Sequence, residues 1–258
     1  MDGSFALTVE EVAVSLSMVG RPEMGRDLIV TQLGEMSAQQ VQARLLAGGH
    51  SLMSKSWLAI GQEGAVYLAD NLARVARVLA RADFSIVYTL SCPPAGFSLA
   101  YHFSEGAVFE HKIEQGVIHR VTELPDSEGV VAGGLAFFGV QDAPDADRGE
   151  IRLPAAALDD IRSERDQARI ACRLADCGVS QDVAQALATD LAGSVARGSA
   201  LRVQYGADGR PTSDRGLLLL RAAGGMWLAR PEANGLDRGV AVRRCDRASF
   251  REEVSALL

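Results

Sequence analysis

The stretch from Phe84 to Leu124 constrains the fold most, because it predicts four consecutive antiparallel strands. The strands are short runs rich in β-branched and aromatic residues, and Gly- or Pro-bearing turns separate them. They cover residues 84–90, 97–103, 107–113 and 117–123. In the second run, large apolar residues alternate with small or polar ones: Phe97, Leu99, Tyr101 and Phe103 against Ser98, Ala100, His102 and Ser104. This alternation predicts a sheet with one packed face and one more solvated face.

The composition is that of an ordinary globular protein. The chain has 258 residues, of which 48% are apolar and 23% charged, so it is long enough to bury a sizeable core. The net charge is -7 and the isoelectric point is about 5.2. Binding to nucleic acid or to an anionic membrane needs clustered Lys and Arg, and this balance argues against both.

Helices are predicted on both sides of the meander. Thr8 and Glu11 form a capping-box pattern, Pro22 opens a second helix, and Ser37 starts a third that is predicted to end at Gly48-Gly49. An amphipathic helix over 67–81 leads into the first strand. After the meander, helices are predicted over 125–140, 155–176, 181–197 and 248–258, and strands over 200–205, 216–222, 225–230 and 239–244.

The two halves of the chain repeat the same order of elements. Residues 42–51 resemble 171–180, since in both a helix ends at Gly and Ser follows, and residues 68–87 resemble 183–203. The sequence therefore predicts an internally duplicated α+β protein, with two helix-helix-meander-helix halves around a central antiparallel sheet flanked by helices. The predicted divisions are an N-terminal helical extension (1–36), a first repeat (37–141), a linker (142–149) and a second repeat (150–258), packed as one globular unit.

No motif for catalysis, for a cofactor or for a metal stands out. Phosphate-binding glycine loops, nucleophile elbows and zinc-protease motifs are missing from the sequence. The four cysteines, Cys92, Cys172, Cys177 and Cys245, have no zinc-type spacing and are predicted to be reduced thiols. We therefore expect a non-enzymatic protein with no cofactor.

Whether the strand histidines share a face depends on the hairpin loops. A three-residue loop at 104–106 would pair Tyr101 with Phe109 and turn His102 away from His111. A similar loop at 114–116 would place His111 opposite His119, whereas a two-residue turn at 115–116 would put them on opposite faces. Two histidines across strands make only half of a metal site, so no metal is predicted.

The three short N-terminal helices leave a DNA-binding alternative open, with a helix-turn-helix and the first hairpin as a wing. Charge argues against it. Within residues 1–60 the cations are outnumbered by the acids: Arg21, Arg26, Arg44 and Lys55 against Asp2, Glu10, Glu11, Glu23, Asp27 and Glu35. A phosphate backbone would be repelled by this balance.

The layout resembles the EspG-type chaperones of mycobacterial type VII secretion. The resemblance covers most of the chain and is carried by the helix-Gly-Val-Ser turn at 171–180 and by the segments 183–188, 201–205, 216–221, 226–231 and 250–258. It implies two related halves around a central sheet with helices on each side, and recognition of a helical protein partner.

The function predicted from these observations is protein binding of a chaperone-like kind, in the cytoplasm, since neither a secretory signal nor a membrane-spanning run is evident. An exposed sheet face or a hairpin tip such as Ser104 to Ala107 would be the means of contact. No partner-binding residue is assigned. The alternatives from other classes are a DNA-binding regulator and an enzyme whose site is assembled only in space.

Overall fold

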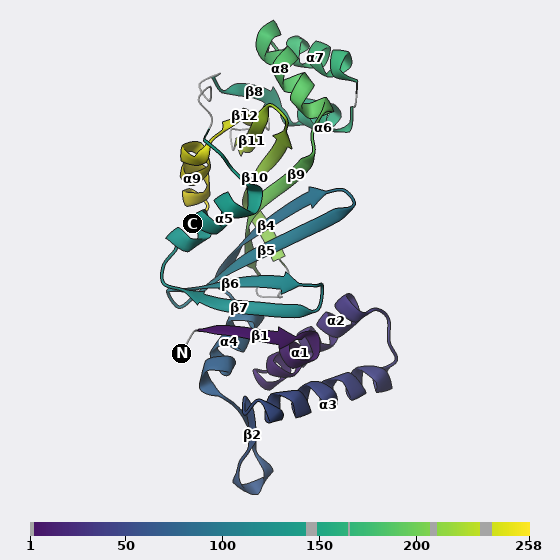
Figure 1. Cartoon of the computed structure of the whole chain (residues 1–258), viewed down its shortest axis with the longest axis vertical. Helices are drawn as coiled ribbons and strands as arrows, with labels where there is room; N and C mark the ends of the chain where they lie inside the picture. The colour runs from purple at the N-terminus through teal and green to yellow at the C-terminus, as the bar shows by residue number, and fades with distance from the viewer. Residues whose placement is uncertain (1–2, 143–148, 165, 207–210, 233–238) are drawn as a thin grey trace. The chain divides into compact units, whose positions relative to one another are not determined.

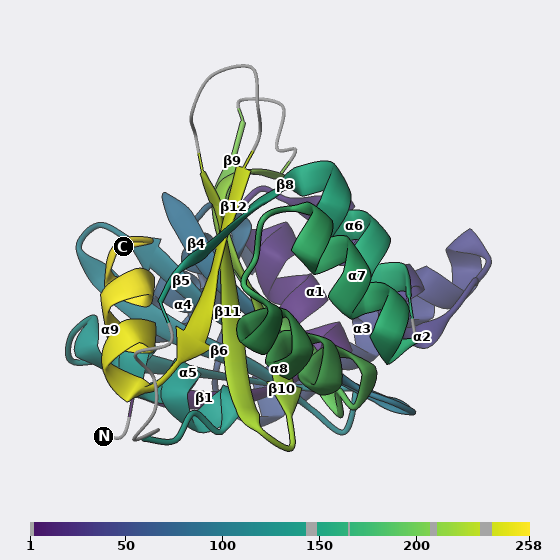
Figure 2. The ribbon, with the colours of Figure 1, turned by 90° about the horizontal axis from the view of Figure 1, so that it is seen from above.

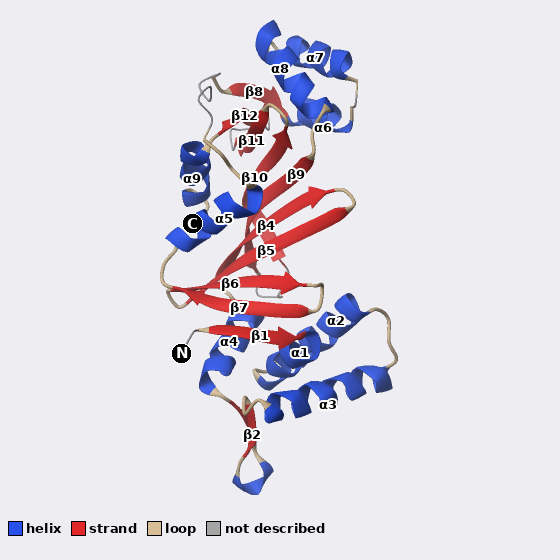
Figure 3. Cartoon of the chain, in the orientation of Figure 1, coloured by secondary structure: helices blue, strands red, loops and turns tan. Residues whose placement is uncertain are grey.

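An antiparallel sheet is the framework of the α+β fold (Figures 1 and 3). The structure is a computed structural model that describes residues 3–142, 149–164, 166–206, 211–232 and 239–258. Within these residues, ten strands follow the order β1-β7-β6-β5-β4-β9-β10-β11-β12-β8, and a separate hairpin pairs β2 with β3.

The strands are β1 Ser4–Thr8, β2 Leu58–Ile60, β3 Val66–Leu68, β4 Phe84–Cys92, β5 Ala95–Ser104, β6 Ala107–Glu114, β7 Ile118–Leu124, β8 Ile151–Pro154, β9 Ala196–Tyr205, β10 Pro211–Ala222, β11 Gly225–Glu232 and β12 Gly239–Cys245. The helices are α1 Val9–Met18, α2 Pro22–Leu33, α3 Ala38–Ser54, α4 Asp70–Ala80, α5 Glu128–Phe138, α6 Ala155–Ser163, α7 Gln167–Asp176, α8 Gln181–Ala192 and α9 Arg247–Ser255, with a short 3-10 turn at Gln62–Gly64.

The chain divides into two compact units, and each is assembled from separate segments. Unit 1 contains Met1–Ser85, Leu99–Ser127 and Gln204–Pro211. Unit 2 contains Ile86–Ser98, Glu128–Val203 and Thr212–Leu258. The predicted linker at 142–149 falls mostly on 143–148, which lie outside the described residues.

Unit 1 begins with a strand that sequence patterns did not indicate. β1 pairs antiparallel with β7, so that Phe5 lies opposite Val121. The predicted capping box then starts α1: Glu11 N donates to Thr8 Oγ1 and Thr8 N donates to Glu11 Oε2, at 3.2 and 2.9 Å. The core of this unit combines β1, β6 and β7 with α1, α3 and α4, and includes Phe5, Leu7, Val12, Leu16, Leu52, Leu72, Val75, Phe109 and Val121.

Helix α3 runs past the point where it was predicted to end. Ser37 caps it as expected, since its Oγ accepts from Gln40 N at 3.3 Å. The helix then continues through Gly48 and Gly49 to Ser54. Gly48 marks a close approach to α1, because a Cβ at this position would lie 2.6 Å from the carbonyl oxygen of Glu10. The glycine therefore serves helix packing here, rather than a C-terminal cap.

The meander is confirmed, but the first hairpin loop has two residues instead of three, and the second has three residues but lies one position later than expected. β5 and β6 are joined by a two-residue turn, Glu105-Gly106, with φ of 52° and 79°, and Ser104 pairs with Ala107. Positive φ at both central residues is the type I′ arrangement that suits hairpins. His102 consequently lies opposite Phe109 and shares a face with His111, contrary to the expectation from a three-residue loop.

The second loop spans residues 115–117, because Glu114 pairs with Ile118. His119 therefore lies opposite Ile113, and His111 lies opposite Val121. The two histidines share a face, offset by two residues instead of directly opposed. The face that carries His102 was predicted to be solvated, and this is wrong. His102 is only 9% exposed, because α1 and α2 cover that side of the strands.

In unit 2, helices cover both faces of the strands. Figure 2 shows α6, α7 and α8 on one side of β11 and α9 on the other. Trp227 belongs to the cluster beneath α6–α8, with Ile161, Ile170, Leu174 and Leu187. On the opposite side, the ring of Phe138 on α5 packs edge-on against Tyr88 and Phe250, with centroids 5.4 and 5.8 Å apart.

The predicted long helix over 155–176 is two helices. α6 ends at Ser163, where Glu164 adopts an extended backbone. α7 begins after Asp166, whose carboxylate accepts from Arg169 N at 2.9 Å. An Asp with extended backbone favours a helix start over a helix interior, which explains the break.

Candidate functional site

Three histidines form a continuous hydrogen-bonded row in unit 1. His102 on β5, His111 on β6 and His119 on β7 point to the same side of the strands. Ser85 Oγ lies 2.8 Å from His102 Nδ1, and His102 Nε2 lies 3.2 Å from His111 Nδ1. His111 Nε2 lies 2.9 Å from His119 Nδ1, and His119 Nε2 lies 2.9 Å from Gln32 Oε1 on α2. The row thus connects strand β4 to helix α2 through three imidazoles.

The row lines an open groove of about 330 Å³ in unit 1. Its apolar lining comes from α1, α2 and α4, and includes Val12, Leu16, Leu28 and Leu79. Burial lowers the pKa of His102 and of His119 to about 4 each. Burial, followed by the charges of its two neighbours, lowers the pKa of His111 to about 3. All three imidazoles are therefore neutral at pH 7.

The row does not have the geometry of a catalytic or a metal site. A Ser hydroxyl on a His nitrogen is the start of a nucleophile-base pair, yet Ser85 is fully buried and out of reach of a substrate. The ring nitrogens bond to one another in sequence instead of converging on one point. In the part of the chain that the structure describes, no group of three or more His, Cys, Asp or Glu side chains is arranged to hold a metal ion.

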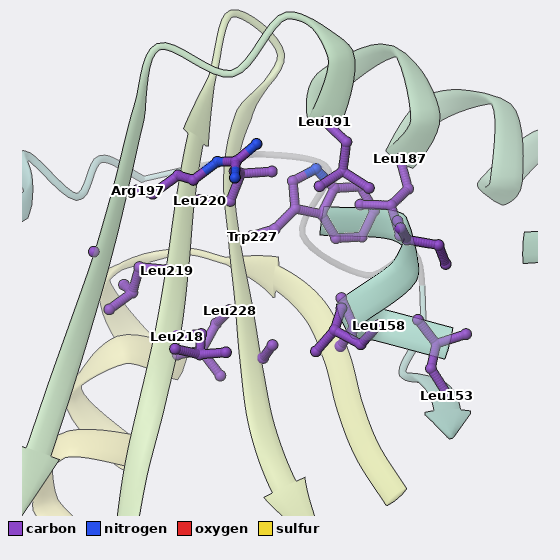
Figure 4. Close-up of a pocket in the computed structure, with 14 residues that line it drawn as sticks. Leu153, Leu158, Leu187, Leu191, Arg197, Leu218, Leu219, Leu220, Trp227 and Leu228 are labelled. Atoms are coloured by element: carbon purple, nitrogen blue, oxygen red, sulfur yellow. The ribbon is translucent and has the colours of Figure 1, made fainter. Parts of the chain in front are cut away.

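An apolar cavity lies in unit 2, between the strands and helices α6 and α8 (Figure 4). Its volume is about 70 Å³, which is enough for one apolar side chain. Leu187 and Leu191 of α8 face Trp227 across it, and Arg197 extends toward Leu220 at its margin. Because the walls are apolar except for Arg197 at the margin, the cavity favours a hydrocarbon occupant over a polar one.

The β2–β3 hairpin of unit 1 exposes large apolar side chains. Ile60 is 62% exposed, Tyr67 58% and Val66 41%. The hairpin extends away from the ends of α3 and α4 (Figure 1), and it forms a sheet of its own. A Cβ at Gly61 would lie 2.7 Å from the Tyr67 ring, so the ring rests on this glycine. An exposed apolar cluster on a two-stranded hairpin is the surface here that most resembles a protein contact.

The hairpin tip suggested by the sequence has a different character. Glu105 and Gly106 are exposed, and Ser104 and Ala107 are half-buried. Glu105 N donates to Asp83 Oδ2 at 3.1 Å, which fixes the turn to the start of β4. Small and polar residues of this kind give little area for an apolar contact.

The cysteines are free thiols dispersed over unit 2. Cys245 is buried, Cys92 and Cys177 are half-buried, and Cys172 is exposed. Burial raises the pKa of the Cys245 thiol to about 12, so it remains protonated and unreactive at neutral pH.

Comparison with known proteins gives one family and one class of fold. The family model described as "Uncharacterised protein YfjC" matches residues 4–254. No curated protein matches the chain. Among solved structures, the type VII secretion system chaperone EspG5 of Mycobacterium tuberculosis, in complex with the PE25–PPE41 dimer, matches with a TM-score of 0.68 and 15% identity. The match covers 98% of this chain and 95% of that one, and it shows an EspG-like α+β fold, as the sequence resemblance implied.

Proposed function

The chain belongs to the family described as uncharacterised protein YfjC, and we propose that it is a non-enzymatic, chaperone-like protein that grips a helical protein partner. The observation that carries the proposal is the match of nearly the whole chain to the fold of a secretion chaperone. Fold alone does not imply function, so the proposal also needs a surface suited to a protein.

We place the contact at the β2–β3 hairpin. Ile60 and Tyr67 are large, exposed and on one small element, and anchoring side chains in protein interfaces are typically apolar or aromatic. An amphipathic helix presents apolar side chains at i, i+3 and i+4, which is the complement that such a cluster would accept. Among the described residues, no helix is both long and apolar enough to cross a bilayer. We propose that the protein acts in the cytoplasm.

Charge pairing weakens the DNA-binding alternative further. Arg44 on α3 pairs with Glu10 at 2.9 Å, and Lys55 pairs with Glu11 at 2.6 Å. Two of the few cations near the N-terminal helices are therefore already neutralised by carboxylates. Phosphate binding would have to compete with these pairs.

The same element order in both halves supports the proposed duplication. The first half has two helices (α3 and α4), four strands (β4–β7) and a helix (α5). The second half has two helices (α7 and α8), four strands (β9–β12) and a helix (α9). An experimental structure in which residues 36–140 and 155–258 have different chain paths would overturn it.

The binding proposal is tested by affinity capture from the native host with three versions of the full chain. The wild type should retain a defined protein, and the Ile60→Ser/Tyr67→Ser variant should lose it. Leu46→Ser is the matched control, because Leu46 is 55% exposed on α3, outside the hairpin. Capture by the wild type and by Leu46→Ser, with at least tenfold less by the double variant, supports the proposal. Recovery of no protein, or equal recovery by all three, overturns it.

A further inference from the structure

The histidine row has no role in partner binding as proposed above. It connects strands that are firmly hydrogen-bonded to each other with a helix, α2, that is mostly exposed. Strands β5, β6 and β7 are tied to each other by ladder hydrogen bonds. Helix α2 has twelve residues, of which only Gly25 and Ile29 are buried. Gly25 packs against Ala13 of α1, near the start of α2, whereas Gln32 lies in its last turn. Ile29 and Leu33 pack into an apolar cluster with Val9, Ala13 and Val41, and the hydrogen bond between Gln32 and His119 ties the last turn of α2 to the sheet.

The number of protons that the row can hold follows from its hydrogen bonds. Gln32 Oε1 only accepts, so His119 must donate from Nε2. In the neutral state each imidazole then donates from Nε2 and accepts at Nδ1, and Ser85 donates to His102. The four links are satisfied by three ring hydrogens and one hydroxyl hydrogen.

One additional proton can also be held without breaking a link. If His111 carries it, His111 donates to both neighbours, and His102 changes tautomer and donates from Nδ1 to Ser85 Oγ. Ser85 accepts in place of donating, which a hydroxyl can do. Four ring hydrogens then serve four links.

A second additional proton cannot be held in this way. Five ring hydrogens exceed the four links, so two N–H groups must face each other in at least one of them. The two charged rings would also be neighbours or next neighbours, with adjacent centroids only 5.1 and 5.5 Å apart. Repulsion at that distance in a buried setting favours separation.

We propose that the histidine row is an acid-sensitive latch, which holds the C-terminal turns of α2 on the sheet when its imidazoles are neutral and releases them when more than one is protonated. The element that moves is α2, because the strands are held by their ladders. Release exposes Leu28 and the apolar lining of the groove further to water.

Few charged groups could substitute for the row or oppose it. Asp27 of α2 lines the same groove, and it would attract a protonated imidazole. Glu123 of β7 shares the sheet face but pairs with Arg74 of α4 at 2.7 Å. By strand alternation, Glu110, Lys112 and Arg120 point to the other face. Glu11 of α1 pairs with Lys55, the residue after α3.

The direct test is amide hydrogen exchange of the full chain between pH 7 and pH 5.5, expressed as protection factors so that intrinsic exchange is corrected. An imidazole that is exposed to water in the opened state has an ordinary pKa near 6.5, so it binds a proton as the pH falls from 7 to 5.5. This proton binding favours the opened state and lowers the protection factor by about tenfold for each imidazole. Amides 28–33 should therefore lose at least tenfold, while those of α4 should change less than threefold. Constant protection at 28–33 overturns the proposal.

Two variants separate the row from general acid effects. His119→Gln removes the ring that contacts α2, and it should reduce the fall in protection by about tenfold. His50→Gln is the matched control, because His50 is exposed on α3 and lies outside the row. An equal fall in His119→Gln and wild type overturns the proposal.

A spectroscopic measurement keeps the test independent of variants that fold poorly. Imidazole nitrogen NMR of the wild type should show the Nε2–H tautomer at all three rings at pH 7. If any of the three imidazoles is protonated above pH 5 while the amides of α2 remain protected from exchange, the latch is contradicted.

Discussion

Trp227 of β11 donates its indole N–H to Oδ2 of Asp190 on α8 across 2.8 Å. The same oxygen lies 2.6 Å from Arg244, whose guanidinium stacks over the Trp227 ring at 4.4 Å. Asp190 is 6% exposed and Trp227 2%. One carboxylate therefore fastens helix α8 to two neighbouring strands of unit 2.

Asp190→Ala should lower the free energy of unfolding of unit 2 by about 3 kcal/mol or more, because it leaves Arg244 and the indole N–H without their acceptor. Asp182→Ala, on the exposed first turn of the same helix, should cost less than about 1 kcal/mol. Denaturant unfolding in a Trp57→Phe background reports on Trp227 alone, since the chain has two tryptophans. Equal losses in both variants would contradict the anchoring role.

Glu11 is a second buried carboxylate, and it joins α1 to α3. It is 0% exposed, accepts from Thr8 N and from Ser51 Oγ at 2.9 and 2.7 Å, and pairs with Lys55 at 2.6 Å. We expect Glu11→Ala to destabilise unit 1 by about 3 kcal/mol. Denaturant unfolding followed by the fluorescence of Trp57 measures this loss. The adjacent Glu10→Ala removes only a surface pair and should cost less than about 1 kcal/mol.

Two adjacent glycines of α3 should respond to alanine with opposite signs. Gly48→Ala places a Cβ against the Glu10 carbonyl and should destabilise by about 1–3 kcal/mol. Gly49→Ala meets no atom within 4 Å and should stabilise the helix by roughly 0.5–1 kcal/mol. Thermal unfolding of both variants measures the difference. Similar shifts would show that α1 and α3 do not approach closely at Gly48.

The apolar cavity of unit 2 should accept added volume. Ala229 lines it and follows Trp227 on the same face of β11, and valine suits a strand. Ala229→Val should raise the free energy of unfolding by roughly 1 kcal/mol, because valine adds two carbon atoms that the cavity buries in part. Cys245→Val, at a buried position of the same unit outside the cavity lining, provides the comparison and should not stabilise. A loss of stability in Ala229→Val would indicate that the cavity is narrower than its volume suggests.

Stability should rise with pH through the histidine range. The pKa values of His102, His111 and His119 are lowered in the folded protein to about 4, 3 and 4, below 6.5 in the unfolded chain. The unfolded state therefore binds more protons between pH 6.5 and 3, so stability is complete above pH 6.5 and is lost as the pH falls. The slope near pH 5 should reach up to ~4 kcal/mol per pH unit for unit 1, and His111→Gln should reduce it by about a third. An unchanged slope would show that the buried histidines do not titrate on unfolding.

Much of the fold follows from local patterns in the sequence. The four strands of the meander, the capping boxes at Thr8 and Ser37 and the proline start of α2 are encoded by neighbouring residues, and the structure confirms them. The continuation of α3 through Gly48 could not be predicted in this way. It depends on the approach of α1, from a distant part of the sequence.

The histidine row shows where the prediction of sites from sequence reaches its limit. Whether His102 and His111 share a face depends on one residue of loop length, and a one-residue change in register reverses every side chain of a strand. The dipeptide Glu105-Gly106 carries the signal for a two-residue turn, although Glu is an unusual occupant of its first position. The third partner, Gln32, comes from a helix whose placement no strand pattern reveals.

The interleaving of the two units has a consequence for how the protein can be dissected. Going along the chain, the path passes from one unit to the other after Ser85, Ser98, Ser127, Val203 and Pro211. No single truncation point therefore yields a complete half, and a fragment such as 150–258 would lack the β4 residues that belong to its own unit. Proteolytic nicking, gene splitting and domain grafting should all damage both units together, so a graft of this protein needs the whole chain to keep both units intact.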